Sequence, residues 1–165
     1  MTFSIKKYLT ERIDVLKSKI LEGVNFTLQA PTGSGKTHAV LMLSQSLTDL
    51  RIVFAMPTQS LVENLKANPK YKDFDLVCGY GTDFYKMNKS ARVVITTYDT
   101  AIKFNDNVDA IFIDEAHLIA GHGNFRKEIL VKLLSLKCTK VLISGTPETI
   151  NHLPNYDSLT FTKKE

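Results

Sequence analysis

Residues 24 to 37 read Val-Asn-Phe-Thr-Leu-Gln-Ala-Pro-Thr-Gly-Ser-Gly-Lys-Thr, and this stretch decides the fold of the chain. Residues 24–29 have the pattern of a buried strand, and an amphipathic helical pattern runs over 37–50. The small residues between them let the backbone curl around a diphosphate, with consecutive N–H groups pointing inward. The start of the helix adds the positive end of its dipole at the same place. The sequence therefore predicts a phosphate-binding loop between a strand and a helix.

The residues of this loop have separate expected roles. Lys36 would reach the β- and γ-phosphates of a nucleotide, and the Thr37 hydroxyl would bind Mg²⁺. Ala30 stands where the usual pattern begins with glycine. The predicted nucleotide-binding residues are Pro31, Thr32, Gly33, Ser34, Gly35, Lys36 and Thr37.

A second stretch, residues 110–117, reads Ala-Ile-Phe-Ile-Asp-Glu-Ala-His and ends an apolar run with two carboxylates. Such a run suits a strand buried on both faces of a parallel sheet, with Asp114 at its carboxyl end, where α/β folds bind ligands. Charges are costly at a buried strand end unless a cation compensates them. We therefore expect Asp114 to hold Mg²⁺ opposite Thr37, and Glu115 to polarise the attacking water.

The rest of the chain alternates strands and helices. This alternation predicts a parallel sheet with helices on both faces. The expected strands are 24–29, 51–56, 76–79, 92–96, 110–114 and 140–144, and the expected helices are 8–21, 37–50, 60–67, 98–103 and 125–136.

Five short runs, in their order along the chain, resemble superfamily 2 helicases and translocases. Residues 30–37 resemble motif I, 56–61 motif Ia, 96–99 motif Ib, 114–117 (Asp-Glu-Ala-His) motif II and 144–147 motif III. The resemblance covers about residues 24–151. It implies an α/β fold, a three-layer RecA-like P-loop domain with a mostly parallel sheet. It also implies ATP and Mg²⁺ as cofactors and Lys36, Asp114 and Glu115 as catalytic residues.

The same resemblance implies a nucleic-acid partner, either DNA or RNA. Thr58, Gln59 and Thr97 follow predicted strand ends, where hydroxyl and N–H groups can meet a phosphate backbone. Helix N-capping is the structural alternative for Thr97. The resemblance further implies that Ser144, Thr146 and His117 couple the nucleotide site to nucleic acid. His117 also argues against the DEAD-box branch of the family.

Motors of this family have two RecA-like domains, with ATP between them. We expect residues 1–165 to form one RecA-like domain, with the second domain supplied in cis or in trans. Because arginines from that second domain are expected to complete the site, this chain alone should bind Mg-nucleotide and turn it over slowly. The Gln that reads adenine in DEAD-box proteins has no counterpart before Gln29, so base selectivity stays open.

Composition agrees with one ordinary globular domain. The net charge of +4 and the pI near 9.0 are compatible with a nucleic-acid partner. Lysines and aromatic residues interleave between 66 and 89, and either stack on single strands or anchor a surface loop. No apolar run is long enough for a membrane span and no signal peptide is visible, so we expect a cytoplasmic protein (nuclear if eukaryotic) that is not secreted. Cys78 and Cys138 are expected to be reduced packing residues.

Two other readings of the phosphate loop stay open. The first is a P-loop enzyme of another class, such as a small-molecule kinase or a switch NTPase. The Asp-Glu-Ala-His run disfavours a kinase, and the lack of an Asn-Lys-x-Asp run disfavours a GTPase. The second is a non-catalytic interaction module that keeps nucleotide as a structural ligand.

Overall fold

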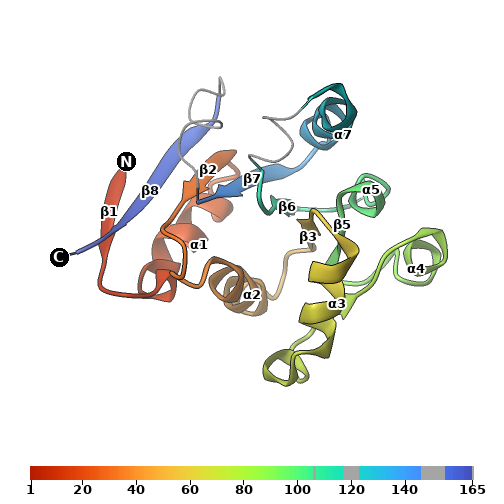
Figure 1. Cartoon of the computed structure of the whole chain (residues 1–165), viewed down its shortest axis with the longest axis horizontal. Helices are drawn as coiled ribbons and strands as arrows, with labels where there is room; N and C mark the ends of the chain where they lie inside the picture. Colours follow the sequence, from red (N-terminus) through yellow and green to blue (C-terminus); the bar gives the residue numbers. More distant parts are fainter. Residues whose placement is uncertain (106, 117–122, 146–154, 165) are drawn as a thin grey trace.

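The computed structural model describes residues 1–105, 107–116, 123–145 and 155–164. Their strands form one eight-stranded sheet in the order β1-β8-β2-β7-β6-β3-β5-β4, in which every pairing is parallel (Figure 1). This confirms the predicted α/β architecture with a parallel sheet. The strands are β1 (Thr2–Ile5), β2 (Phe26–Gln29), β3 (Ile52–Met56), β4 (Val77–Cys78), β5 (Val93–Thr97), β6 (Ala110–Ile113), β7 (Thr139–Ser144) and β8 (Asp157–Lys163).

Helices cover both faces of the sheet. One face carries α1 (Ile13–Leu21), α2 (Lys36–Ser46) and α3 (Gln59–Ala67), and the other carries α5 (Tyr98–Ala101) and α7 (Gly123–Leu134), as Figure 1 shows. The helix α4 (Thr82–Met87) lies beyond the β5–β4 edge, and two 3₁₀ turns, η1 (Leu9–Arg12) and η2 (Pro69–Tyr71), flank the first face.

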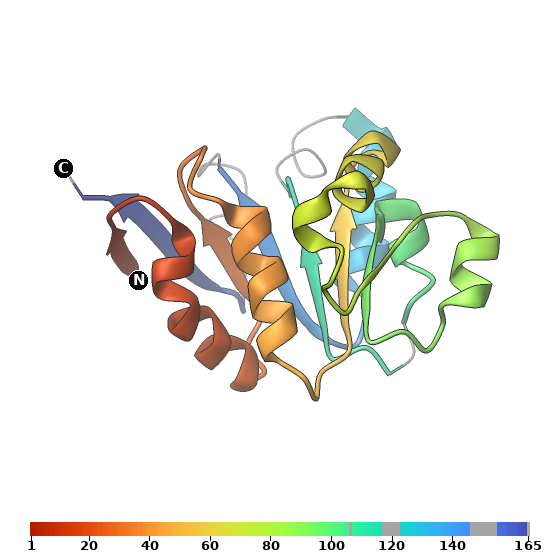
Figure 2. The same ribbon diagram turned by 90° about the horizontal axis from the view of Figure 1, so that it is seen from below.

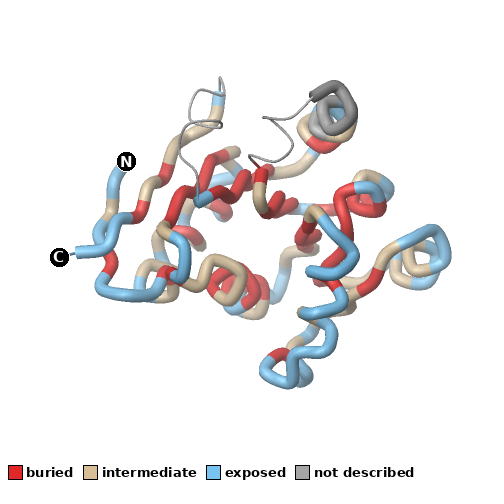
Figure 3. The backbone as a smooth tube through the Cα atoms, viewed as in Figure 1, coloured by how far each residue is buried: buried red, intermediate tan, exposed pale blue. Residues whose placement is uncertain are grey.

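The central strands are buried along their whole length because both of their faces are covered (Figure 3). Alternate residues contribute to two cores, as the period of two in a strand requires. Phe54 and Phe112 stack with ring centroids 6.4 Å apart in the core under α1, α2 and α3. Val53 and Ile111 lie in the core under α5 and α7. The apolar runs of the sequence are therefore explained by a doubly covered sheet.

All described strands run in one direction, so their carboxyl ends share one edge of the sheet. Figure 2 shows this edge with the β2–α2 loop and the start of α2 beside it. The residues directly after β3, β5, β6 and β7, which are Pro57, Tyr98, Asp114 and Gly145, lie at the same edge. This edge is where α/β proteins bind their ligands.

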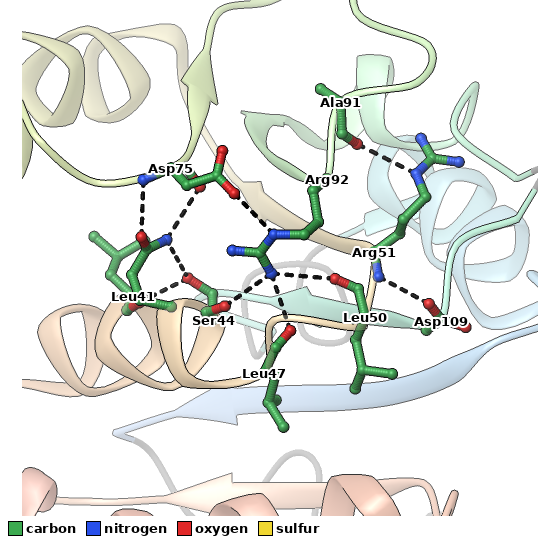
Figure 4. Close-up of polar contacts among 10 residues, drawn as sticks. Leu41, Ser44, Leu47, Leu50, Arg51, Asp75, Ala91, Arg92 and Asp109 are labelled. Atoms are coloured by element: carbon green, nitrogen blue, oxygen red, sulfur yellow. Dashed lines mark hydrogen bonds and ion pairs between the residues drawn. The ribbon is translucent and has the colours of Figure 1, made fainter.

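The opposite end of α2 is held by an arginine (Figure 4). Nη1 of Arg92 donates to the backbone oxygens of Ser44, Leu47 and Leu50, at 3.1, 2.9 and 3.3 Å. Its Nε forms a 2.8 Å ion pair with Asp75. Because the last carbonyls of a helix lack partners within the helix, this cation both satisfies them and complements the helix dipole.

Some elements differ from the sequence-based expectation. The helix expected over 8–21 begins as the 3₁₀ turn η1, and α4 forms where a loop between strands was expected. Neither β1 nor β8 is among the expected strands. β1 is short, largely exposed and paired with β8, which lies far from it in the sequence. The other boundaries shift by a few residues. None of the described helices is long and apolar enough to cross a membrane.

Candidate nucleotide and nucleic-acid sites

The β2–α2 loop has the backbone geometry that a phosphate cradle requires. Gly33 and Gly35 have φ of 81° and 75°, a region that residues with a Cβ rarely adopt. Ser34 is fully buried, and its N–H and hydroxyl both donate to the backbone oxygen of Pro31, at 3.1 and 2.6 Å. These bonds fold the loop back on itself just before α2. The seven residues predicted to bind nucleotide therefore lie in one continuous segment, with 31–35 in the turn and Lys36 and Thr37 at the start of α2.

Lys36, the first residue of α2, lies across the mouth of this turn. Its Nζ donates to the backbone oxygens of Ala30 at 3.1 Å and of Pro31 at 3.2 Å. A Cβ added at Gly145, after β7, would lie 3.5 Å from that Nζ and 3.7 Å from Oγ1 of Thr32. Burial lowers the pKa of Lys36, and the carboxylates of Glu115 and Asp114 act against that shift. The lysine thus lies near both predicted acids.

The acids follow β6 at the same edge. The Asp114 N–H donates to the Ala55 oxygen at 2.9 Å and the Ala116 N–H to the Ile143 oxygen at 3.0 Å, so the ladder continues past the strand. Asp114 is 6% exposed, and burial, followed by the nearby Glu115 charge, raises its pKa to about 6. A buried carboxyl with a raised pKa at a ligand-binding edge is typical of a functional site.

Tyr98 holds the backbone of this acidic pair. Glu115 has φ of 52°, which is uncommon for a residue with a Cβ. The buried Tyr98 hydroxyl donates to the backbone oxygen of Asp114 and, at 3.3 Å, to that of Glu115. Tyr98 begins α5 directly after Thr97. The sequence predicts a helix over 98–103 but gives no sign that Tyr98 contacts the Asp114 and Glu115 backbone, because this contact joins the ends of two different strands.

A pocket of about 350 Å³ adjoins the phosphate loop on the side of η1. Its lining comes from three separate segments and comprises Tyr8, Thr10, Gly35, His38 and Lys70. Nδ1 of His38 lies 3.0 Å from the Tyr71 hydroxyl, which connects the start of α2 to η2. Among these residues the sequence predicts a nucleotide-binding role for Gly35 alone, because only the packing of η1 and η2 on either side of α2 brings the others to it.

A second pocket, of about 270 Å³, lies at the ends of β3 and β5. It brings together Gln59 and Thr97, two of the three predicted nucleic-acid contacts. Their neighbours in the lining are Pro57, Tyr80, Gly81, Asp99 and Thr100. Thr58, the third contact, is exposed beside it and caps α3, with its Oγ1 accepting the Leu61 N–H at 3.2 Å.

Thr97 stands at the N-cap of α5, but its side chain makes no capping bond. Its hydroxyl lies 3.3 Å from that of Thr100, which in turn accepts the Gly81 N–H at 2.9 Å. This chain of bonds links the end of β5 to the loop after β4. The helix-cap alternative for the Thr97 side chain is therefore not what the structure shows.

Comparison with known proteins identifies the family of this chain. The DEAD/DEAH box helicase family matches residues 14–153. The chain belongs to this family. It is similar to the Helicase POLQ-like protein of Caenorhabditis elegans, with 30% identity over 87% of this chain and 17% of that protein. It is also 28% identical, over 84% of its length, to a protein of Sulfolobus islandicus filamentous virus (isolate Iceland/Hveragerdi) named as a helicase.

Solved helicase structures share the fold. The Hef helicase domain of Pyrococcus furiosus superposes over 92% of this chain and 38% of that one, with a TM-score of 0.63 and 21% identity. The helicase MrfA bound to DNA superposes over 92% of this chain and 27% of that one, with a TM-score of 0.65 and 18% identity. The chain spans about a quarter and a sixth of the lengths of its two sequence relatives. It is thus a superfamily 2 helicase ATP-binding domain.

The predicted coupling residues are only partly described. Ser144 ends β7, is fully buried and lies in register with Gln29, the last residue before the phosphate loop. It therefore lies beside the loop predicted to bind nucleotide, and its coupling role stays a prediction. His117 and Thr146 lie outside the described residues, so their roles stay predictions.

The aromatic residues between 71 and 85 mostly anchor loops in this helicase domain. Tyr71 is buried with its ring 5.1 Å from that of Phe74, and Tyr85 packs edge-on against Phe104 at 4.8 Å. Tyr80 also packs against the core, and it lines the pocket beside Thr97. Tyr80 is therefore the aromatic residue of this segment that lies beside the predicted nucleic-acid contacts Gln59 and Thr97.

Proposed function

We propose that this helicase domain binds Mg-ATP at the β2–α2 loop and hydrolyses it slowly until a second RecA-like domain completes the site. The observation that carries the proposal is the meeting of three groups from distant parts of the sequence at one sheet edge. These groups are Lys36 of the loop and the carboxyls of Asp114 and Glu115, whose charges oppose the fall in the Lys36 pKa. The family match speaks against the kinase and switch-NTPase alternatives.

The residues present fit a magnesium nucleotide. The left-handed glycines at 33 and 35 allow the loop to wrap a diphosphate, and α2 begins at the end of this turn. The Thr37 hydroxyl and the Asp114 carboxylate are the oxygen ligands that Mg²⁺ prefers. The raised pKa of Asp114, about 6, means that the protein environment disfavours its ionised form, and a bound cation would favour that form. Bound Mg²⁺ would supply charge neutralisation on the phosphates.

The chain's own residues have distinct expected tasks. Lys36 exchanges its bonds to the Ala30 and Pro31 oxygens for phosphate oxygens. Glu115 accepts a proton from the attacking water, and Tyr98 keeps its backbone in the left-handed conformation that aims it. The pocket of Tyr8, Thr10, His38 and Lys70 adjoins the loop and takes the sugar and base. Arginines of a second domain, in cis or in trans, are expected to raise the rate by about 10³–10⁵.

Nucleic acid is proposed to bind along the ends of β3 and β5. Thr58, Gln59 and Thr97 offer hydroxyl, amide and backbone N–H groups to phosphates there, and Tyr80 offers a ring for a base. The superposed structures of MrfA and of a Sulfolobus solfataricus SWI2/SNF2 ATPase core are complexes with DNA. We therefore propose DNA as the first partner to test, with RNA as the alternative.

Steady-state ATP hydrolysis, with and without single-stranded DNA or RNA, tests the proposal. Lys36→Ala provides the background, and Mg-ATP affinity is measured in parallel. We expect measurable binding, very slow turnover, and loss of binding in Lys36→Ala. Glu115→Gln should bind Mg-ATP as the parent does and lose the residual turnover. Fast hydrolysis by the chain alone would contradict the half-motor proposal, and parental turnover in Glu115→Gln would contradict the role of Glu115.

A further inference from the structure

The segment between β1 and η1 is organised by one carboxylate. Oε1 of Glu11 accepts the backbone N–H of Lys6, and Oε2 accepts those of Lys7 and Tyr8, each at 2.8 Å. These backbone bonds, with that from Lys6 the largest contribution, lower the pKa of Glu11 to about 2. Three consecutive N–H groups converge on one side chain only when the backbone is fixed in a tight turn. Glu11 therefore determines the shape of residues 6–8.

This turn contacts the phosphate loop at two points. The N–H of Leu9 donates to the backbone oxygen of Ser34 at 2.8 Å, and the Leu9 side chain is fully buried. A Cβ at Gly35 would lie 3.8 Å from Cδ1 of Tyr8, so the Tyr8 ring stands beside the last glycine of the loop. The turn thus touches both the loop backbone and the pocket proposed for the base.

Glu11 itself is exposed. The hydrophobic contacts that hold this region come from Leu9, Leu16 and Ile20 instead. The bonds of Glu11 are therefore local, and their loss should change the turn more than the core.

We infer that Glu11 is a positioning residue for the nucleotide site. Its carboxylate fixes the Lys6–Tyr8 turn. This turn places the Leu9 N–H where it donates to the Ser34 oxygen, and it places the Tyr8 side chain in the lining of the pocket proposed for the base. The inference rests on the proposed function, because it concerns the same site. It assigns to an exposed acid, far from the helicase motifs in sequence, a part in shaping that site before nucleotide arrives.

The test compares the parent chain with Glu11→Ala, Glu11→Gln, Tyr8→Ala and the control Asp14→Asn, an exposed acid of α1. Dissociation constants are measured for Mg-ATP and for magnesium tripolyphosphate, which lacks base and sugar. Thermal melting and hydrogen exchange at the Leu9 amide are measured on the same samples. Lys36→Ala reports the binding that is lost when the loop itself fails.

We expect Glu11→Ala to weaken both ligands by about five- to twentyfold, since the loss of charge-assisted bonds loosens the loop backbone. Leu9 amide exchange should accelerate, and Glu11→Gln, which keeps one acceptor oxygen, should fall between parent and alanine. Tyr8→Ala should weaken Mg-ATP but not tripolyphosphate, and Asp14→Asn should match the parent.

Two results would overturn the inference. If Glu11→Ala melts lower but binds both ligands with parental affinity, Glu11 is structural only, and the proposed function stands as long as Lys36→Ala loses binding. If the parent itself binds neither ligand, the proposed function fails and the inference fails with it.

Discussion

Asp114→Asn should stabilise the domain at neutral pH in the absence of Mg-nucleotide. The carboxyl is 6% exposed, and its pKa is raised from 3.8 to about 6. Since the folded state favours the protonated form, the parent loses stability as pH rises from about 4 to about 6, and stays at the lower level above that. At about 1.4 kcal/mol for each pH unit between the two pKa values, the loss is about 3 kcal/mol at pH 7. Asparagine cannot ionise, so the Asp114→Asn variant avoids this loss of stability.

The assay is thermal melting of parent and Asp114→Asn between pH 4 and 8 with EDTA present. The difference between the two melting temperatures should be small near pH 4 and grow to roughly 6–12 °C by pH 7, given about 2–4 °C per kcal/mol for a domain of this size. Asp14→Asn, on the exposed surface of α1, controls for the loss of a charge. A difference that does not change with pH would refute the reasoning, because it would mean that Asp114 titrates normally in the folded chain.

Three other substitutions test contacts around the site and beneath it. Tyr98→Phe keeps the packed ring but removes its bonds to the Asp114 and Glu115 backbone, and should cost about 1–2 kcal/mol in urea unfolding; parental stability would mean that the hydroxyl is dispensable. Arg92→Ala leaves three carbonyls at and just after the end of α2 without their cation and should cost about 2–4 kcal/mol. The control Asp75→Asn, an exposed partner, should cost less than about 1 kcal/mol, and equal costs would contradict the capping role. Thr96→Val should raise the free energy of unfolding by about 1 kcal/mol, since the buried Thr96 hydroxyl has no hydrogen-bond partner within the described part of the chain; a loss of stability would show that it has one.

The fold and the positions of the candidate site groups were largely predictable because their signals are local. The run from 24 to 37 contains strand, glycine turn and helix within one short segment, and the acids at 114 and 115 directly end an apolar strand. The start of the first helix was less predictable. Leu9 contacts Ser34 there, and a 3₁₀ turn replaces the first part of the expected regular helix. Strand β1 could not be found from its own residues, because its four positions are mostly exposed and their pairing partner is β8.

The residues alone were enough to predict a phosphate-binding loop, a pair of acids at a strand end and a parallel α/β sheet. Periodicity and glycine placement express these features over a few residues. Only the tertiary structure decided which distant residues share a site. Tyr98 reaches the backbone of Glu115, Glu11 shapes the turn that holds Ser34, and Tyr8 and Lys70 line one pocket. These contacts join segments from different parts of the fold, and the order of strands in the sheet, which no local pattern encodes, brings several of them to one edge.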